Sequence, residues 1–322
     1  MQAEGMGVGG DHGSPYDAHG ANPSHGLDGG VCEVPDEGPV LARVLLGLRL
    51  RELRRVRRMT AGQAADGISV SAEAINWLES GCAPVSLHEV IDLCELYGVA
   101  DLTERTTLLS LAREANVAGW WDRYKGVVPA WHLPYLGFEH AARVIRAVGV
   151  QSVHDLLQTR EYARAQLEQA YPLLTDSEIE LRVELRMARQ HLLHRDAPPH
   201  LWVLAEESSL RRPAGSRATM FRQLEHLIDL CDLPRVTVQI IPFGRSVPAV
   251  NRGAFTLLSL RGFSVPGSLP DLVYLQQLTT GLYLDSHPEV ERYRHAHHAL
   301  ATSAAVPASQ TQSRLLRISR EL

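Results

Sequence analysis

Apolar residues recur at helical spacing through the first third of the chain, and further along they also alternate over short stretches. Leu46, Leu50 and Leu53 are four and three residues apart, which places them on one face of a helix. Val56 continues this stripe, and the predicted helix ends at Met59. We therefore expect the first helix of an N-terminal helical domain here, with its apolar stripe turned toward a core.

Two shorter helices are predicted directly after the first. Thr60–Gln63 has the form of a capping box, in which two side chains satisfy free backbone N–H groups at a helix start. Ser71 is a favourable N-cap for the next helix. That helix buries Ile75 and Leu78, and Gly81 is expected to end it in a left-handed turn.

A short helix, a tight turn and a second helix with one apolar face form the unit that places its second helix in the major groove of DNA. The side chains predicted to face the bases are Ser71, Glu73, Asn76 and Trp77. Those predicted to contact phosphates are Arg54, Arg55, Arg58 and Gln63. The alternative for the arginine run is a solvated helix face, because residues 41–115 hold nine arginines against ten acidic residues.

The C-terminal part mixes helix and strand signals. Thr175–Glu178 is a second capping box, and the helix after it repeats apolar side chains at Leu181, Leu185, Ala188 and Leu192. A further helix carries Phe221, Leu224, Ile228 and Cys231. Short strands are predicted at Val236–Pro242, Phe255–Leu260 and Leu272–Leu275. These patterns predict an α+β domain that is larger than the N-terminal domain.

Length and composition suit two domains and a tail. The chain has 322 residues, 45% of them hydrophobic, and a formal net charge of −5, which is ordinary for globular domains. Residues 1–38 contain seven acidic residues and no lysine or arginine, so a disordered acidic tail rich in Gly and His is expected. The predicted boundaries are 1–38 for the tail, 39–116 for the helix-turn-helix domain and 117–322 for the α+β domain, which would bind an effector or a partner.

Motifs that carry catalysis or hold cofactors are missing from the sequence. It contains no G-x-S-x-G, H-E-x-x-H or phosphate-cradling loop. Gly5–Gly10 matches G-x-G-x-x-G, but no predicted strand precedes it. His191 and His194 lie three residues apart without a third metal ligand, and we interpret His295, His297 and His298 in the same way. Catalytic residues, a metal site and a cofactor are therefore not predicted.

The sequence also indicates a compartment. Its four cysteines include no C-x-x-C pair, so reduced thiols are the simplest interpretation. No apolar run approaches the roughly 20 residues of a membrane span. We therefore expect a cytoplasmic protein without membrane contact.

Aromatic residues gather just after the predicted helix-turn-helix domain. Trp120, Trp121, Tyr124 and Trp131 lie within a dozen residues of one another, and aromatic walls are typical of small-molecule pockets. Two interpretations follow, a ligand pocket and a packed core between the domains, of which the packed core is favoured.

Motifs in both parts resemble known families. The N-terminal part carries, in order, Leu46-Gly47, Leu50-Arg51-Glu52-Leu53-Arg54, Met59-Thr60, Ile75 and Leu78-Glu79-Ser80-Gly81. This order resembles the XRE family of phage-repressor-like helix-turn-helix proteins. The C-terminal part carries Gly119-Trp120-Trp121-Asp122, Tyr135–Glu139, Leu156–Thr159, Leu210–Pro213 and Val236–Phe243. That order is similar to the domain of unknown function in actinobacterial (Streptomyces-type) WhiJ-like, antitoxin-like regulators.

The resemblance implies a mainly α, lambda-repressor-like N-terminal domain and a larger α+β C-terminal domain. It implies a transcriptional regulator that binds double-stranded DNA, with a small protein partner or a small-molecule effector. A homodimer is expected by analogy, because two helix-turn-helix units must span adjacent major grooves.

The predicted recognition helix departs from the family. Members usually carry a lysine or arginine where this chain has Ala74 and Trp77, and often a glycine at the position of Arg58. Since arginine and lysine make the commonest specific base contact, three hypotheses stay open. They are a regulator with a sensing C-terminal domain, an antitoxin-type binder of a small partner, and an enzyme or ligand-binding protein of natural-product biosynthesis that has lost DNA readout.

Overall fold

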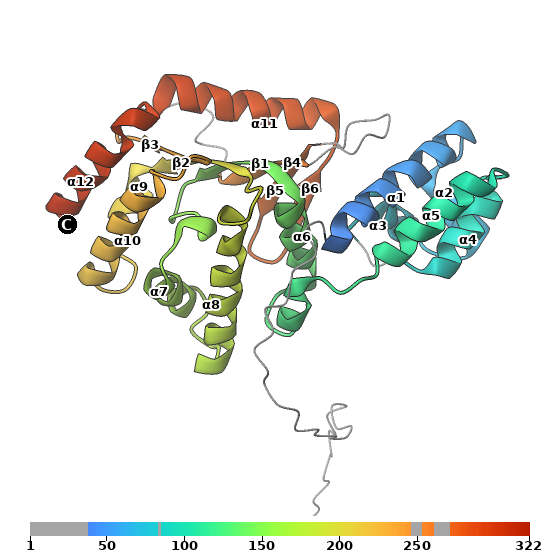
Figure 1. The fold of residues 1–322 in the computed structure, drawn as a ribbon, viewed down its shortest axis with the longest axis horizontal. Coiled ribbons are helices and arrows are strands. Elements are labelled where there is room, and N and C mark those ends of the chain that lie inside the picture. The colour runs from blue at the N-terminus through green and yellow to red at the C-terminus, as the bar shows by residue number, and fades with distance from the viewer. Residues whose placement is uncertain (1–37, 83–84, 246–252, 261–270) are drawn as a thin grey trace, which may run out of the picture. The chain divides into compact units, whose positions relative to one another are not determined.

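The computed structural model describes residues 38–82, 85–245, 253–260 and 271–322 (Figure 1). The predicted acidic tail, with the Gly5–Gly10 motif, lies outside these residues. The described residues belong to one compact unit that runs from Pro35 to Leu322. They form a group of helices followed by a mixed sheet with helices, which confirms the predicted fold class.

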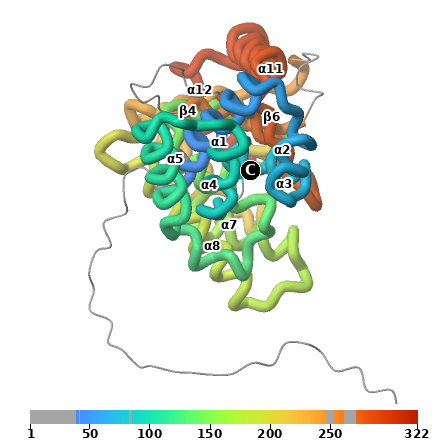
Figure 2. Tube along the Cα trace, turned by 90° about the vertical axis from the view of Figure 1, so that its right-hand side faces the viewer, coloured from blue at the N-terminus to red at the C-terminus, as the bar shows by residue number. Residues whose placement is uncertain are grey.

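The N-terminal helices are α1 (Gly38–Val56), α2 (Ala61–Ile68), α3 (Ala72–Glu79), α4 (Leu87–Leu96) and α5 (Leu102–Glu114), grouped in blue and teal in Figures 1 and 2. The predicted capping box is confirmed, because Thr60 accepts from the backbone N–H of Gln63 and Gln63 from that of Thr60. Ser71 caps α3, and Gly81 follows α3 with a φ of +71°. These local signals set where the two short helices begin and end.

The core of this helical group contains most of the predicted stripe. Leu46, Leu50 and Ile75 are at most 1% exposed. Val56 is an exception, since its side chain is 73% exposed. It is the last residue of α1, where the chain leaves the helix for the turn to α2, so the prediction that it continues the buried stripe is wrong.

The remaining helices with more than one regular turn are α6 (Leu133–Ala141), α7 (Arg160–Ala170), α8 (Asp176–Gln190), α9 (Glu207–Arg211), α10 (Arg217–Leu230), α11 (His287–Ala299) and α12 (Thr311–Glu321). The strands are β1 (Ala142–Gly149), β2 (His200–Glu206), β3 (Val236–Ile241), β4 (Phe255–Leu260), β5 (Leu272–Gln276) and β6 (Gly281–Leu284). The capping box at Thr175 and Glu178 is confirmed. Strands β3, β4 and β5 confirm the three predicted strands, whereas β1, β2 and β6 were not predicted.

The strands of the described residues form one sheet in the order β3-β2-β1-β4-β5-β6. β1, β2 and β3 are parallel neighbours, and each pairing from β1 through β4 and β5 to β6 is antiparallel. Parallel neighbours need a crossover connection. The crossover from β1 to β2 contains α7 and α8, and the one from β2 to β3 contains α9 and α10.

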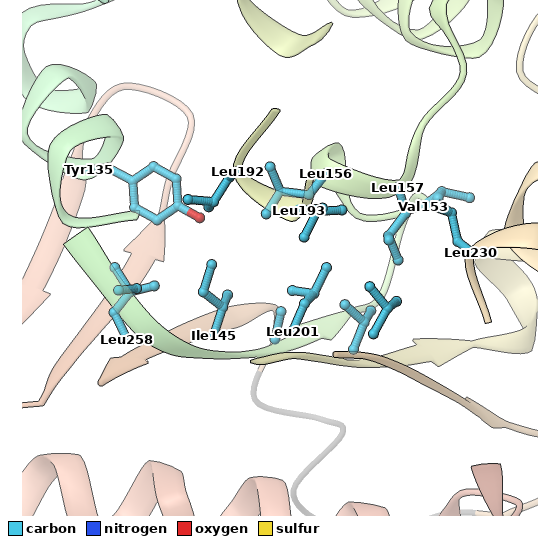
Figure 3. Packing of buried hydrophobic residues seen from close by; sticks show 14 of the residues in the cluster. Tyr135, Ile145, Val153, Leu156, Leu157, Leu192, Leu193, Leu201, Leu230 and Leu258 are labelled. Carbon is cyan, nitrogen blue, oxygen red and sulfur yellow. The ribbon is translucent and has the colours of Figure 1, made fainter. Parts of the chain in front are cut away.

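Helices cover both faces of the sheet. On one face Ile145, Leu201 and Leu258 pack against side chains such as Leu156 and Leu192 (Figure 3). On the other face a second cluster joins strand residues to α11 and to the π-helical turn Leu300–Ala304. The result is a three-layered α/sheet/α arrangement, which explains why β1 and β2 carry buried side chains on both faces.

Two helices of this domain bury most of the stripe predicted for them. Leu185 and Leu192 of the first stripe and Leu224 of α10 are buried, whereas Leu181 of α8 is 40% exposed and Phe221 of α10 is 44% exposed. The buried face of α8 also includes Val183 and Arg189. Arg189 belongs to a buried polar site, described below, that the apolar spacing alone does not reveal.

α1 contributes to two cores. Leu46 and Leu50 belong to the core of the helical group. Val40 and Val44 belong to the main core under the sheet, together with Phe138 of α6. Gly137 permits this contact, because a Cβ at this position would lie 1.8 Å from the Cγ2 atom of Val40. Helix α1 is therefore a shared structural element of both parts of the chain.

No helix in the described part of the chain is long and apolar enough to cross a membrane.

Candidate nucleic-acid interface

The outward face of α3 is the centre of the candidate interface. Glu73, Asn76 and Trp77 are exposed on this face, while Ile75 and Leu78 anchor the opposite face with exposures of 1% and 4%. The helical period thus separates the predicted base-reading side chains from the core. Ser71, also predicted to face the bases, is exposed and holds the start of α3 by accepting from the backbone N–H of Ala74 at 3.0 Å.

Trp77 is an unusual surface residue, with 53% of its area exposed. The Asn76 side-chain amide makes no hydrogen bond within the described residues. A side-chain amide with unused donor and acceptor atoms can pair with adenine in the major groove. Asn76 and Trp77 therefore offer one polar and one apolar contact group, next to the carboxylate of Glu73.

A buried carboxylate fixes the end of α3 to α1. Arg54 grips both oxygens of Glu79, with Nε to Oε1 at 2.6 Å and Nη2 to Oε2 at 2.7 Å, and its Nη1 donates to the Met59 carbonyl at 2.8 Å. The Glu79 side chain is only 2% exposed. Hydrogen bonds to Glu79 raise the pKa of Arg54 above its ordinary value and outweigh the opposing effect of burial. This bidentate pair ties the ends of the first and third helices together.

A second arginine reaches the same carboxylate. Arg51 Nε lies 3.5 Å from Glu79 Oε2, and its Nη1 donates to Asp285 Oδ2 at 2.8 Å. Asp285 directly follows strand β6. Sequence reasoning missed this link, because Asp285 lies 234 residues from Arg51 and no local pattern connects them.

Most arginines of the first helix and its turn have partners inside the protein. Arg49 pairs with Glu52 and Glu104, and Arg57 donates to the carbonyls of Tyr97 and Gly98. With Arg51 and Arg54 engaged as well, four members of the predicted run are committed to the fold. The run is therefore largely a structural feature and less a free cationic face.

Arg55 and Arg58 remain as exposed cations, with no hydrogen-bond or ion-pair partner among the described residues. Arg58 has a φ of +57°, in the left-handed region that favours glycine. Gln63 is exposed, and its Oε1 atom accepts from the backbone N–H of Thr60 at 2.9 Å in the capping box. Of the side chains predicted to contact phosphates, Arg55, Arg58 and the amide nitrogen of Gln63 have no partner among the described residues. Arg54 is instead paired with Glu79.

The aromatic group after α5 packs into the core. Trp121 and Tyr124 are 3% and 1% exposed, and Trp120 lies edge-on to Trp121 at 5.7 Å between ring centroids. Trp120 and Trp131 are half-buried against the same core. Trp131 also lines a surface pocket formed by described residues. This placement agrees with the favoured packing interpretation for Trp120, Trp121 and Tyr124.

Histidines do not assemble into a metal site in the described part of the chain, where no group of three or more His, Cys, Asp or Glu side chains has the geometry of metal ligands. His191 and His194 are exposed. His297 is buried against Trp202, with ring centroids 5.0 Å apart, whereas His295 and His298 are exposed.

Comparison with known families agrees with this architecture. Residues 45–108 match a family model described as a helix-turn-helix domain, which suggests a DNA-binding regulator. Residues 134–317, more than half of the chain, match a model described as a domain of unknown function (DUF5753). The chain therefore belongs to the DUF5753 family and is a helix-turn-helix regulator with this C-terminal domain. No curated protein and no solved structure matches it.

Proposed function

We propose that this protein is a transcriptional regulator that reads double-stranded DNA through the outward face of α3 and responds to an effector through its C-terminal domain. The observation that carries the proposal is that face itself. Glu73, Asn76 and Trp77 stand exposed on a helix whose other side is anchored by Ile75, Leu78 and the Glu79–Arg54 pair. A rigid, outward helix of this kind is what groove binding requires.

Base readout would rest on few groups. Asn76 can pair with adenine, and Glu73 can accept from the amino group of cytosine. Trp77 would pack against a thymine methyl group or a sugar, because its ring is the large apolar surface on this face. This face carries no cation for the bidentate contact to guanine, so the proposed operator has A·T pairs under Asn76 and Trp77 and a cytosine under Glu73.

Phosphate contacts would come from Arg55, Arg58 and Gln63. Arg54 would act indirectly, by holding α3 in place through Glu79. Two free arginines at the described interface of each protomer predict a weak dependence of affinity on salt for a regulator of this class.

The proposed assembly is a homodimer, because a single short recognition helix with two phosphate-binding arginines provides little affinity on its own. Membership of the actinobacterial, WhiJ-like subfamily and a small protein partner of antitoxin type are part of the same proposal, supported by the residue motifs quoted above. The alternative of an enzyme or ligand-binding protein without DNA readout gains no support from either family match.

The test uses competition binding with the full chain, a fragment of DNA from its own upstream region and unrelated DNA as competitor. Asn76→Ala and Trp77→Ala should each weaken specific binding by about fivefold to a hundredfold, the range expected for losing one base contact. Leu102→Ala is a matched control, because Leu102 is 78% exposed in the same domain but lies on α5. Specific binding that survives in both α3 variants would contradict direct readout by this helix.

A further inference from the structure

The C-terminal domain contains a cationic pocket that the DNA interface does not use. It is a cavity of about 70 Å³ that is open to solvent, and it is lined by side chains that include Trp131, Tyr171, Arg182, Arg186, Arg189 and Gln276. Aromatic walls with a few polar groups, as in this lining, are typical of small-molecule sites. Three arginines of α8 thus meet two aromatic rings at one site.

Two of the arginines are neutralised by buried acids. Arg189 binds both oxygens of Glu139 and one oxygen of Asp155, each at 2.8 Å. Arg186 donates to Gln158 at 2.8 Å and lies 3.5 Å from Asp155. Burial opposes ionisation of Asp155, but Arg186 and Arg189 outweigh it and hold the pKa of this carboxyl below its ordinary value. Both cations are therefore balanced by ionised carboxylates at neutral pH.

Arg182 is the third cation and has no such balance. Within the described residues it forms no ion pair, and its Nε atom is buried without a hydrogen-bond partner. Glu178, one turn earlier on α8, interacts with Arg182 only through space, because its carboxylate accepts from the backbone and hydroxyl of Thr175. Arg182 lines the pocket without a carboxylate partner among the described residues, so a bound anion could form a charge-assisted hydrogen bond with it. The pocket therefore carries one positive charge that no salt bridge balances.

Aromatic surfaces frame this charge. The Arg182 guanidinium lies over the Tyr171 ring, with Cζ 4.5 Å from the centroid. This contact orients the guanidinium plane and leaves Tyr171 39% exposed. Trp131 supplies a second, half-buried ring to the lining.

We propose that this pocket binds a small anion that carries an aromatic ring. Its carboxylate or phosphate group pairs with Arg182, and its ring packs against Tyr171 and Trp131. The pocket is then the sensing site of the C-terminal domain, and this consequence rests on the regulatory function proposed above.

A hairpin connects the pocket with the DNA-binding helices. Gln276, the last residue of β5, lines the pocket and pairs in register with Gly281 of β6. Tyr283 of β6 donates to the carbonyl of Trp131 at 2.7 Å. Two residues later Asp285 binds Arg51, which also contacts Glu79 at the end of α3. In this proposal, ligand contact with Trp131 or Gln276 shifts the hairpin between two positions, and Asp285 transmits the shift to Arg51.

The pocket is tested by isothermal titration calorimetry on the full chain without DNA. The probes are 4-hydroxybenzoate, phenyl phosphate, inorganic phosphate and the neutral 4-hydroxybenzamide. We expect at least one aromatic anion to bind, inorganic phosphate to bind more weakly, and the neutral amide not to bind. Arg182→Gln should weaken binding at least about tenfold, the loss of one charge-assisted hydrogen bond. Tyr171→Leu should also weaken it, whereas Arg222→Gln, which removes an exposed arginine from α10, should leave it unchanged.

Failure to bind any aromatic anion at millimolar concentration would overturn the pocket, whatever the DNA experiments show. Binding that is unchanged in Arg182→Gln, or equal for inorganic phosphate, would also overturn it. The sensing role is measured separately, as a shift in DNA affinity when the bound probe is added. A shift that disappears in Asp285→Asn supports the hairpin route, and a shift that persists there contradicts it. Loss of DNA binding by the wild-type chain itself would count against the regulator and not against the pocket.

Discussion

At the scale of single residues, Arg58 in the turn between α1 and α2 combines a strained backbone with the proposed phosphate contact. Arg58 adopts a φ of +57°, where a side chain other than glycine costs about 1 kcal/mol. Its guanidinium is exposed and has no partner among the described residues. A strained backbone that presents a free cation toward solvent is consistent with the proposed phosphate contact.

Two substitutions at Arg58 distinguish the effect of backbone strain from the effect of the lost charge. Arg58→Gly should raise the free energy of unfolding by about 0.5–1 kcal/mol, because it removes the left-handed penalty. Arg58→Ala keeps the penalty and should not be stabilised. Both remove the charge, so both should weaken DNA binding to a similar extent. Urea unfolding and DNA titration of the two variants check this, and equal stability of both would argue against backbone strain.

His297 should make stability depend on pH. Burial first, and Arg146 second, lower its pKa from about 6.5 to about 4, and its Nε2 atom has no partner. The unfolded chain therefore binds this proton at a higher pH than the native state does. The stability it contributes is complete above about pH 6.5 and is lost as the pH falls toward 4.

We expect the free energy of unfolding to fall over this interval, with His132, whose pKa burial also lowers to about 4, contributing in the same direction. His297→Leu should reduce the slope by about one proton, or about 1.4 kcal/mol per pH unit. Urea titrations at pH 7, 6 and 5 measure the slope. A variant with the wild-type slope would show that His297 does not carry this linkage.

At the scale of elements, the Glu79–Arg54 pair holds the helix-turn-helix unit together. Glu79→Gln leaves Arg51 and Arg54 beside a neutral amide, and the Arg54 side chain is largely buried. Removing one partner of a buried pair typically costs about 3–5 kcal/mol. Glu73→Gln, on the exposed face of the same helix, should change stability by less than about 0.5 kcal/mol. Chemical denaturation measures both, and a loss below about 1 kcal/mol for Glu79→Gln would contradict the role of this pair.

The sequence allowed some elements to be predicted because their signals are local. Capping residues Thr60, Ser71 and Thr175 mark helix starts, and β-branched alternation marks β3. Strand β1 was missed because charged Arg143 and Arg146 interrupt its apolar pattern, although it lies in the middle of the sheet. Of the stripe predicted on and after α8, Leu185 and Leu192 are buried, but the apolar spacing gives no sign that the charged Arg189 takes a core position opposite Glu139.

In the candidate interface, too, features with a local sequence signal were predictable and features that depend on distant residues were not. The exposed face of α3 follows from the helical period of Ile75 and Leu78. The ion pairs of Arg54 and Arg49 could not be predicted in this way, because their acidic partners Glu79 and Glu104 lie 25 and 55 residues away along the chain. The spacing of arginines along one helix does not show which of them form ion pairs with distant acidic residues in the folded protein.

At the scale of the whole molecule, α1 makes the helix-turn-helix unit and the C-terminal domain depend on each other. A Cβ at Gly137 would collide with Val40 of α1 at 1.8 Å. Gly137→Ala should therefore destabilise the chain by about 1–3 kcal/mol, as overpacking does. Gly126→Ala is the matched control, since a Cβ there would meet nothing within 4 Å. Thermal unfolding of both variants measures the difference, and equal stability would contradict tight packing of α1 on α6.

The central claim is that α3 reads DNA with few supporting phosphate contacts, and the dependence of specific affinity on salt tests it most directly. Arg55 and Arg58, the two free arginines at the described interface of each protomer, predict for a dimer that log K falls with log salt at a slope of about −4. Arg55→Gln and Arg58→Gln in the same chain should bring the slope close to zero. A slope near −8 would mean that Arg54 and Arg57 leave their partners for phosphates. No preference for upstream DNA over competitor at any salt concentration would contradict the regulator itself.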